Sequence, residues 1–389
     1  MTIPQPVDLA PLGQMLLVGA MVAFLALGWL WLRRRAQPGR SWQQKLTVLT
    51  LVLTFDLVVF GAFTRLTDSG LGCPDWPGCY GHASPVGAVL HISAAQEAMP
   101  TGPVTHGKAW IEMLHRYLAT GVGALILVLA AASWRQRAAS AQARPAWVRW
   151  WPTLTLVWVC LQGAFGAWTV TMKLRPAIVT LHLLGGMALL AMLCVQAAHQ
   201  ARQQPGWTPP VALDGLTARM LRTTGVLLAV QLALGGWVST NYAVLACTDF
   251  PLCQSSWWPE MRFDQGFQIW RDLGMTRDGE PIAFAALTAI HMAHRWMAYA
   301  VLLALGGLVL RLRALGHLQA QARWLTALAL LQLGSGLANV ILGWPLLAAL
   351  LHTAGAAGLV LVLTWAFTRS TAPLPASRAA AVGVPGVSA

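Results

Sequence analysis

A cysteine motif and a pair of histidines each occur twice in this chain of 389 residues. The motif Cys-x-Asp-aromatic-Pro-x-Cys runs from Cys73 to Cys79 and again from Cys247 to Cys253. Each copy precedes a long apolar segment with a His-Arg dipeptide, and each half ends with a further histidine in an apolar segment. The histidines are His115 and His182 in the first half, and His294 and His352 in the second. Such pairs at membrane depth are the ligands expected of a metal or heme centre.

The spacing of these features indicates a duplication. Matching cysteines lie 174 residues apart, the His-Arg histidines 179 and the last histidines 170. Near-constant offsets predict two copies of one four-helix unit, in which the histidine-bearing helices face each other across a bundle. Each copy crosses the membrane an even number of times, so the pseudo-twofold axis should run along the membrane normal.

An arginine follows the first histidine of each pair, at Arg116 and Arg295. A guanidinium inside a membrane helix needs an anion, and heme propionates would supply one through bidentate hydrogen bonds. The alternative is that both side chains reach outward to the lipid headgroups. Arg65 flanks the first outer loop and is placed with the cofactor-binding residues, although its counterpart is Ser239.

The two copies differ beside the first histidine. Glu112 lies three residues before His115, whereas His291 takes the equivalent place before His294. A carboxylate beside an iron ligand is a candidate proton acceptor, and His291 is a candidate cofactor contact. A simple ion pair between Glu112 and Arg116 is an equally weighted alternative. The difference suggests that one half reacts while the other only holds a cofactor.

The four motif cysteines are predicted to form two disulfides, Cys73 with Cys79 and Cys247 with Cys253. They lie in loops assigned to the outside, where the compartment is oxidising. The alternative is zinc binding, in which the two pairs combine into one four-thiolate site. Six residues of separation within each pair are wide for zinc, which favours the disulfides.

Composition predicts an all-α polytopic membrane protein. The chain is 57% apolar and only 10% charged, and apolar runs long enough to cross a bilayer recur along it. The predicted spans are 11–32, 46–64, 109–133, 151–172, 176–198, 222–246, 282–310, 324–343 and 346–368. Basic residues are spread over many loops despite the net charge of +13, so no nucleic-acid partner is expected.

Most arginines and lysines lie in alternate loops. The positive-inside rule then puts the N-terminus and both cysteine loops outside, and the C-terminus in the cytoplasm. The predicted units are an extra N-terminal helix with its basic loop at 1–45, a four-helix bundle at 46–199, a linker at 200–221, a second bundle at 222–368 and a disordered tail at 369–389.

Five segments carry a resemblance to a known family. They are TRLTDSGLGCPDWPGC at 64–79, EMLHR at 112–116, TLHLLGG at 180–186, HMAHR at 291–295 and LHTAG at 351–355. With these segments in this order, the chain resembles heme A synthase, the membrane enzyme that converts heme O to heme A for terminal oxidases. The segments span nearly the whole duplicated core.

The resemblance implies an eight-helix core of two four-helix bundles. The C-terminal bundle would hold heme b through His294 and His352. The N-terminal bundle would bind substrate heme O through His115 and His182, and Glu112 would be needed for turnover. The reaction would oxidise the C8 methyl group of heme O to a formyl group by successive hydroxylations, with water as the oxygen source.

Two other functions would use the same histidines. One is a diheme b-type cytochrome that transfers electrons or oxidises quinol, and the other is a heme transporter or chaperone. Neither needs two unequal halves, so the difference between Glu112 and His291 favours the enzyme. The partners expected of it in the bacterial inner membrane are heme O synthase and an electron acceptor, and a second copy of the chain is a further candidate.

Overall fold

The computed structural model describes residues 10–32, 41–139, 146–202, 204 and 206–371. Within them, nine helices are long and apolar enough to cross a membrane, which confirms a polytopic all-α membrane protein. These nine are α1 (Ala10–Leu32), α2 (Trp42–Leu66), α4 (His106–Ala139), α5 (Ala146–Thr171), α6 (Pro176–Ala201), α7 (Gly215–Thr240), α9 (Phe284–Ala314), α10 (Gln319–Ile341) and α11 (Leu346–Thr368). The remaining elements are α3 (Val89–Ala98), the short helices η2 (Ala243–Ala246) and α8 (Phe263–Gly266), and the strands β1 (Val211–Ala212) and β2 (Ser370–Thr371).

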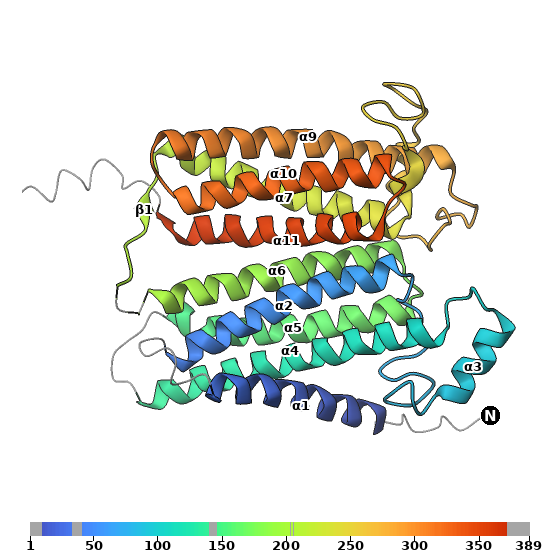
Figure 1. Cartoon of the computed structure of the whole chain (residues 1–389), viewed down its shortest axis with the longest axis horizontal. Helices are drawn as coiled ribbons and strands as arrows, with labels where there is room; N and C mark the ends of the chain where they lie inside the picture. The colour runs from blue at the N-terminus through green and yellow to red at the C-terminus, as the bar shows by residue number, and fades with distance from the viewer. Residues whose placement is uncertain (1–9, 33–40, 140–145, 203, 205, 372–389) are drawn as a thin grey trace, which may run out of the picture.

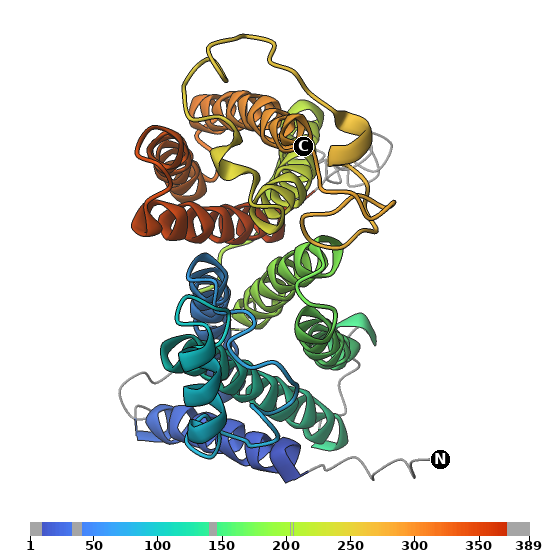
Figure 2. The same cartoon turned by 90° about the vertical axis from the view of Figure 1, so that its right-hand side faces the viewer.

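The long helices form two groups of four, one from each half of the chain (Figure 1). Helices α2, α4, α5 and α6 make the first group, and α7, α9, α10 and α11 the second. Helices α2 and α6 pack against α11, and α6 also packs against α7, so these four form the boundary between the halves. Helix α1 lies on the far side of α4 (Figure 2), outside the duplicated unit as its sequence position suggests.

Equivalent residues of the two halves meet at one place. Arg65 Nη2 donates to the carbonyl of Ser239 at 2.8 Å, and these two positions correspond in the repeat. Tyr242 donates its hydroxyl proton to Asp68 Oδ1 at 2.7 Å, and these positions also correspond. Two equivalent residues can touch only beside the axis that relates them. The pseudo-twofold axis therefore passes between the C-terminal ends of α2 and α7.

Local chemistry sets where the helices begin. Ser41 caps α2 by accepting a hydrogen bond from the Gln44 N–H, and Pro176 opens α6 at a first-turn position that needs no amide hydrogen.

Inside α2, the hydroxyls of Thr50 and Thr54 donate to carbonyls four residues earlier, at 2.8 and 2.7 Å. Buried hydroxyls are thereby satisfied within their own helix.

Several helix boundaries differ from those predicted. The span expected at 222–246, and with it the end of the linker, is wrong because Asp214 caps α7 and the helix begins at Gly215. The same helix ends at Thr240, where Tyr242 takes a left-handed backbone conformation with φ of 54°. Helix α9 begins at Phe284, so His294 lies ten residues into α9, much as His115 lies nine into α4.

Two short parallel strands join the linker between the two halves to the end of the last helix, α11. Val211 pairs with Ser370 and Ala212 with Thr371, at the end of the bundles opposite the cysteine loops. The predicted tail therefore begins with an ordered strand. Its remainder, 372–389, lies outside the described residues, as do 1–9 and 33–40 of the predicted first unit.

Candidate heme sites

The second histidine pair faces across the C-terminal bundle. His294 of α9 and His352 of α11 have ring centroids 6.4 Å apart, with planes at 71°. Metal–imidazole bonds are about 2 Å long and a ring centre lies roughly 1 Å beyond its nitrogen, so two imidazoles on one metal have centres ~6 Å apart. The pair therefore has the separation that two axial ligands of one iron require.

Each of the four histidines lies against a glycine of a neighbouring helix. A Cβ built on the glycine would lie 3.0 Å from the Cε1 of the imidazole at Gly61 and Gly235, which is tight, and 3.4–3.5 Å from it at Gly166 and Gly336, which is ordinary van der Waals contact. In each half the two glycines come from the first and third helices, and the histidines from the second and fourth. The pairs are Gly61 with His115, Gly166 with His182, Gly235 with His294 and Gly336 with His352.

The C-terminal histidines have polar partners at Nδ1. Ser335 Oγ lies 3.0 Å from His352 Nδ1, and the Ser335 hydroxyl donates to the Leu331 carbonyl at 2.6 Å. The amide nitrogen of Gln231 lies 3.1 Å from His294 Nδ1, and its Oε1 is buried without a partner. A heme ligand that bonds iron through Nε2 needs an acceptor at Nδ1, and the Ser335 oxygen meets this need at His352.

The N-terminal histidines lack such partners. Nδ1 of His115 and Nδ1 of His182 are both buried without a hydrogen bond. The His115 ring instead stacks on Phe60, with centroids 6.2 Å apart and planes at 18°. Both rings retain a buried nitrogen that could accept a metal bond, but their surroundings are less polar than those of His294 and His352.

Both arginines that follow a histidine bind backbone carbonyls of the cysteine loops. Arg116 donates to the carbonyls of Asp75 and Gly78 at 3.1 and 2.5 Å. Arg295 donates to the carbonyls of Asp249 and Leu252 at 3.0 and 2.9 Å, and these are the equivalent residues of the second loop. Both side chains thus anchor the cysteine loops, and the contact with heme propionates stays a prediction.

Both predicted disulfides form, Cys73–Cys79 and Cys247–Cys253. The aspartate within each motif then binds the turn that follows the second cysteine. Asp249 accepts hydrogen bonds from the backbone N–H groups of Ser255 and Gln254, both at 2.8 Å, and these bonds lower the pKa of its carboxyl. Each loop is therefore closed by a disulfide, an aspartate and an arginine.

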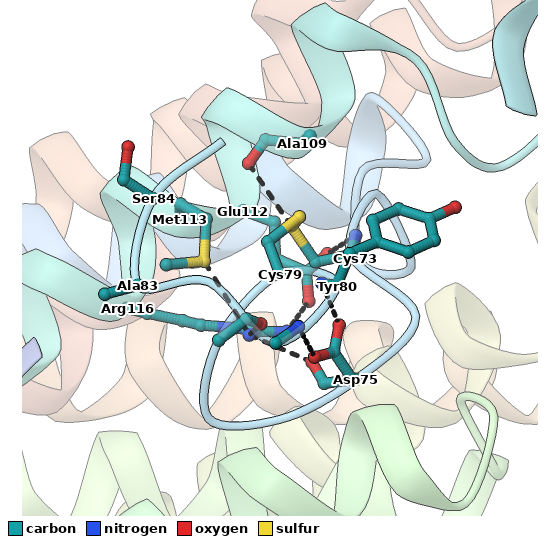
Figure 3. Close-up of a disulfide and its surroundings, with 12 residues drawn as sticks. Cys73, Asp75, Cys79, Tyr80, Ala83, Ser84, Ala109, Glu112, Met113 and Arg116 are labelled. Carbon is teal, nitrogen blue, oxygen red and sulfur yellow. Dashed lines mark hydrogen bonds and ion pairs between the residues drawn. A yellow bond between two sulfur atoms is a disulfide. The ribbon is translucent and has the colours of Figure 1, made fainter. Parts of the chain in front are cut away.

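Glu112 forms the ion pair that was one of its two predicted roles. Its Oε1 lies 2.5 Å from Arg116 Nη2, and its Oε2 accepts the backbone N–H of Cys73 at 2.8 Å (Figure 3). Both side chains are buried, with Glu112 4% and Arg116 8% exposed. The carboxylate thus lies beneath the first disulfide, where it is held by a cation and an amide hydrogen.

The other two predicted cofactor contacts have protein partners. His291 is buried, and its Nε2 accepts from Arg295 Nε at 3.3 Å, which repeats the Glu112–Arg116 pairing without a carboxylate. Arg65 Nη1 donates to the Tyr242 hydroxyl at 2.6 Å across the boundary between the halves. The structure brings Arg65 to the pseudo-twofold axis and not to a histidine pair.

Among the described residues, no group of three or more His, Cys, Asp or Glu side chains is placed to hold a metal ion. A heme needs only two iron ligands from the protein, because the porphyrin supplies four. With two histidines on facing helices, glycines beside each ring and an acceptor at Nδ1 of His352, the residues fit a heme.

The family model described as "Cytochrome oxidase assembly protein" matches residues 44–364, nearly the whole duplicated core. The chain belongs to this family. Similar relatives named "Heme A synthase" include that of Shewanella oneidensis, 36% identical over 315 residues, which cover 81% of this chain and 92% of the relative. Those of Rhizorhabdus wittichii and Mesorhizobium japonicum are 27% and 29% identical, covering 82% and 88% of this chain and 91% and 94% of the relatives.

Four residues that lie around the histidines were not predicted from the sequence. Gly166, Gly336, Gln231 and Ser335 all contact or face an imidazole. The two glycines could have been found, because they lie at the same 170-residue offset as His182 and His352. Gln231 and Ser335 have no matching polar residue in the first half, so the repeat gave no signal for them.

Proposed function

We propose that this protein is a heme A synthase, an oxidoreductase that converts the C8 methyl group of heme O to a formyl group by successive hydroxylations. Support comes from its family, from relatives of that name along most of the chain, and from the histidine geometry. The separation of 6.4 Å between the rings of His294 and His352 carries the heme assignment. The two unequal halves favour an enzyme over a diheme cytochrome or a heme transporter.

The two bundles have different tasks in this proposal. His294 and His352 hold heme b, which when bound supplies a route for the electrons that leave the substrate. His115 and His182 hold heme O and fix its ring, so that one methyl group meets the same protein groups in each turnover. Glu112, the one acidic residue of α4, receives a proton near that ring.

The same proposal includes the orientation in the membrane. Both disulfide loops lie at one end of the bundles, and the β1–β2 pair lies at the other (Figure 1). Disulfides persist in an oxidising compartment, and the basic loops favour the cytoplasm. We therefore place the N-terminus and the disulfide loops outside and the C-terminus in the cytoplasm of a bacterial inner membrane.

Mass spectrometry of hemes tests the proposed activity. Membranes from cells that make this protein together with a source of heme O are expected to contain heme A. A His115→Ala variant should accumulate heme O instead. If extracts of the wild type contained only heme b, an electron-transfer cytochrome would be favoured. Unmodified heme O that exchanges freely would favour a transporter.

The placement of the cofactor has a spectroscopic test. His352→Ala is expected to remove a low-spin heme b spectrum from the purified protein, because one axial ligand is lost. An unaltered spectrum would remove heme b from the C-terminal bundle. Far-ultraviolet circular dichroism of the same sample checks that the helices have formed.

A further inference from the structure

The polar side-chain partners that the structure gives these four histidines belong to the second half. Ser335 lies beside His352, and its equivalent at the 170-residue offset is Phe165. Gln231 lies beside His294, and its equivalent at the 174-residue offset is Leu57. The glycines next to the rings are shared by both halves, so the difference is restricted to the groups that face Nδ1.

The hydrogen-bond geometry at Ser335 fixes the tautomer of His352. The hydroxyl hydrogen is used toward the Leu331 carbonyl at 2.6 Å, so toward the imidazole the oxygen can only accept. Nδ1 must then carry the hydrogen of the contact at 3.0 Å. The lone pair of Nε2 is left free, which is the form that binds iron.

Gln231 can do the same for His294. Its amide nitrogen lies 3.1 Å from Nδ1 and 3.3 Å from Nε2, while its Oε1 is buried without a partner. A 180° rotation of the side-chain amide exchanges its two end atoms, so that Oε1 lies beside the ring and accepts from Nδ1–H. The buried oxygen then gains a hydrogen bond, and the ring lone pair in this tautomer is on Nε2.

We propose that Gln231 and Ser335 are positioning residues that make the C-terminal pair a permanent heme ligand set, and that the apolar Leu57 and Phe165 make the N-terminal pair an exchangeable one. This inference rests on the proposed function. A hydrogen bond from Nδ1 fixes the ring and makes Nε2 more basic, which strengthens its bond to iron. A cofactor must stay bound through many turnovers, whereas a substrate must leave as product.

Heme transfer to apomyoglobin tests the inference without measuring catalysis. The full-length protein is purified in a His182→Ala background, so that only the C-terminal pair can hold heme through two histidines. Ser335→Ala is expected to raise the rate of heme loss by about 10–100-fold and to raise the reduction potential of the heme. Ser335→Thr keeps the hydroxyl and should leave both quantities near the parent values. Equal rates and potentials in the Ala and parent proteins would overturn the inference.

A variant with the opposite expected effect distinguishes the proposed role from loss of the fold, because misfolding cannot slow the loss of heme. Leu57→Gln introduces an amide at the position equivalent to Gln231 with little change in side-chain size, and it is measured in a His352→Ala background. Heme loss from the N-terminal pair should slow by about 10-fold, and the reduction potential should fall. No change in either quantity would count against the inference.

The outcomes separate this inference from the proposed function. If His294→Ala leaves the low-spin heme b spectrum intact, the cofactor is elsewhere and the proposed function fails. If His294→Ala abolishes that spectrum while Ser335→Ala and Gln231→Leu change neither heme loss nor potential, the cofactor assignment stands and only the positioning role fails.

Discussion

The Glu112 carboxylate has two roles, one observed in the structure and one proposed for the reaction. It neutralises Arg116 and accepts the Cys73 amide hydrogen, and it is also the acid proposed to receive a proton during turnover. Both roles are compatible if the carboxylate alternates between holding the loop and holding a proton. The matched position in the other half, His291, keeps only the contact with the following arginine.

Substitution of Glu112 can separate the two roles. Glu112→Gln keeps an oxygen for the Cys73 N–H but removes the negative charge. We expect heme content to be unchanged and heme A formation to fall by about 100-fold or more, the range usual for loss of an acid–base group. Mass spectrometry of extracted hemes and the Soret absorbance of the purified protein measure the two quantities.

Glu112→Ala is the comparison. It also leaves the buried Arg116 guanidinium without its anion, and breaking a buried pair costs about 3–5 kcal/mol. This variant should therefore unfold at a lower temperature than Glu112→Gln. Normal heme A production by the Gln variant would show that the carboxylate serves the loop alone.

At the scale of elements, each disulfide loop is attached to a membrane helix by one arginine. Arg116 and Arg295 reach equivalent carbonyls in the two loops, although their own positions in the repeat are offset by 179 and not 174 residues. The same contact has therefore been kept despite a change in loop length between the copies.

Replacement of the anchoring arginine should weaken the loop. Arg116→Lys keeps the charge but has no planar fork to reach several carbonyls, and we expect a loss of about 2 kcal/mol in the free energy of unfolding. Thermal unfolding in detergent measures this. Arg262→Lys, in the exposed pair with Asp264 on the second loop, is the matched control and should change stability by less than about 0.5 kcal/mol. Equal effects of the two substitutions would contradict the anchoring role.

The start of α7 depends on pH through Asp214. Hydrogen bonds from the Thr217 hydroxyl and backbone N–H groups lower the pKa of Asp214 from 3.8 to about 2. Because the folded-state pKa lies below the unfolded one, this stabilisation is complete above pH 3.8 and is lost as the pH falls toward 2.

Asp214→Asn should therefore remove part of the acid sensitivity of the fold. At neutral pH the wild type is expected to melt at a higher temperature than the variant, and the gap should close between about pH 4 and pH 2. Thermal scans monitored by circular dichroism across that range provide the measurement. A gap that is constant with pH would exclude a contribution from the charge of Asp214.

For the whole molecule, the contact between the halves is polar at the end of the bundles that carries the disulfide loops. Arg65, Asp68, Ser239 and Tyr242 form one hydrogen-bonded group on the pseudo-twofold axis. Nearby, Arg175 of the first half pairs with Asp272 of the second at 2.6 Å. Burial raises the pKa of the Tyr242 phenol, so its hydroxyl stays protonated and can donate to Asp68 at neutral pH.

A double-mutant cycle measures how far this group couples the halves. Arg65→Ala and Tyr242→Phe are expected to couple by about 1 kcal/mol in thermal unfolding, because each removes the same hydrogen bond. A cycle between Tyr242→Phe and Arg262→Ala, which share no partner, should give no coupling. Additive effects of the first pair would show that the axis contact does not hold the halves together.

Features carried by order and spacing along the chain were determined by the sequence alone. The duplication, the nine apolar spans, the two disulfides and the four histidines all follow from residue type and interval, because repeats and helix lengths are properties of a linear pattern. The family resemblance depended on the same kind of information.

Contacts between helices were decided only by the tertiary structure. The sequence shows that each guanidinium needs hydrogen-bond acceptors, but it does not distinguish loop carbonyls from propionates. Only the packing of the helices places Arg116 and Arg295 under the disulfide loops. The same holds for Arg65 on the axis and for Ser335 and Gln231 beside the imidazoles. A hydrogen bond depends on distance and direction in space, and residues up to 177 positions apart have neither until the helices pack.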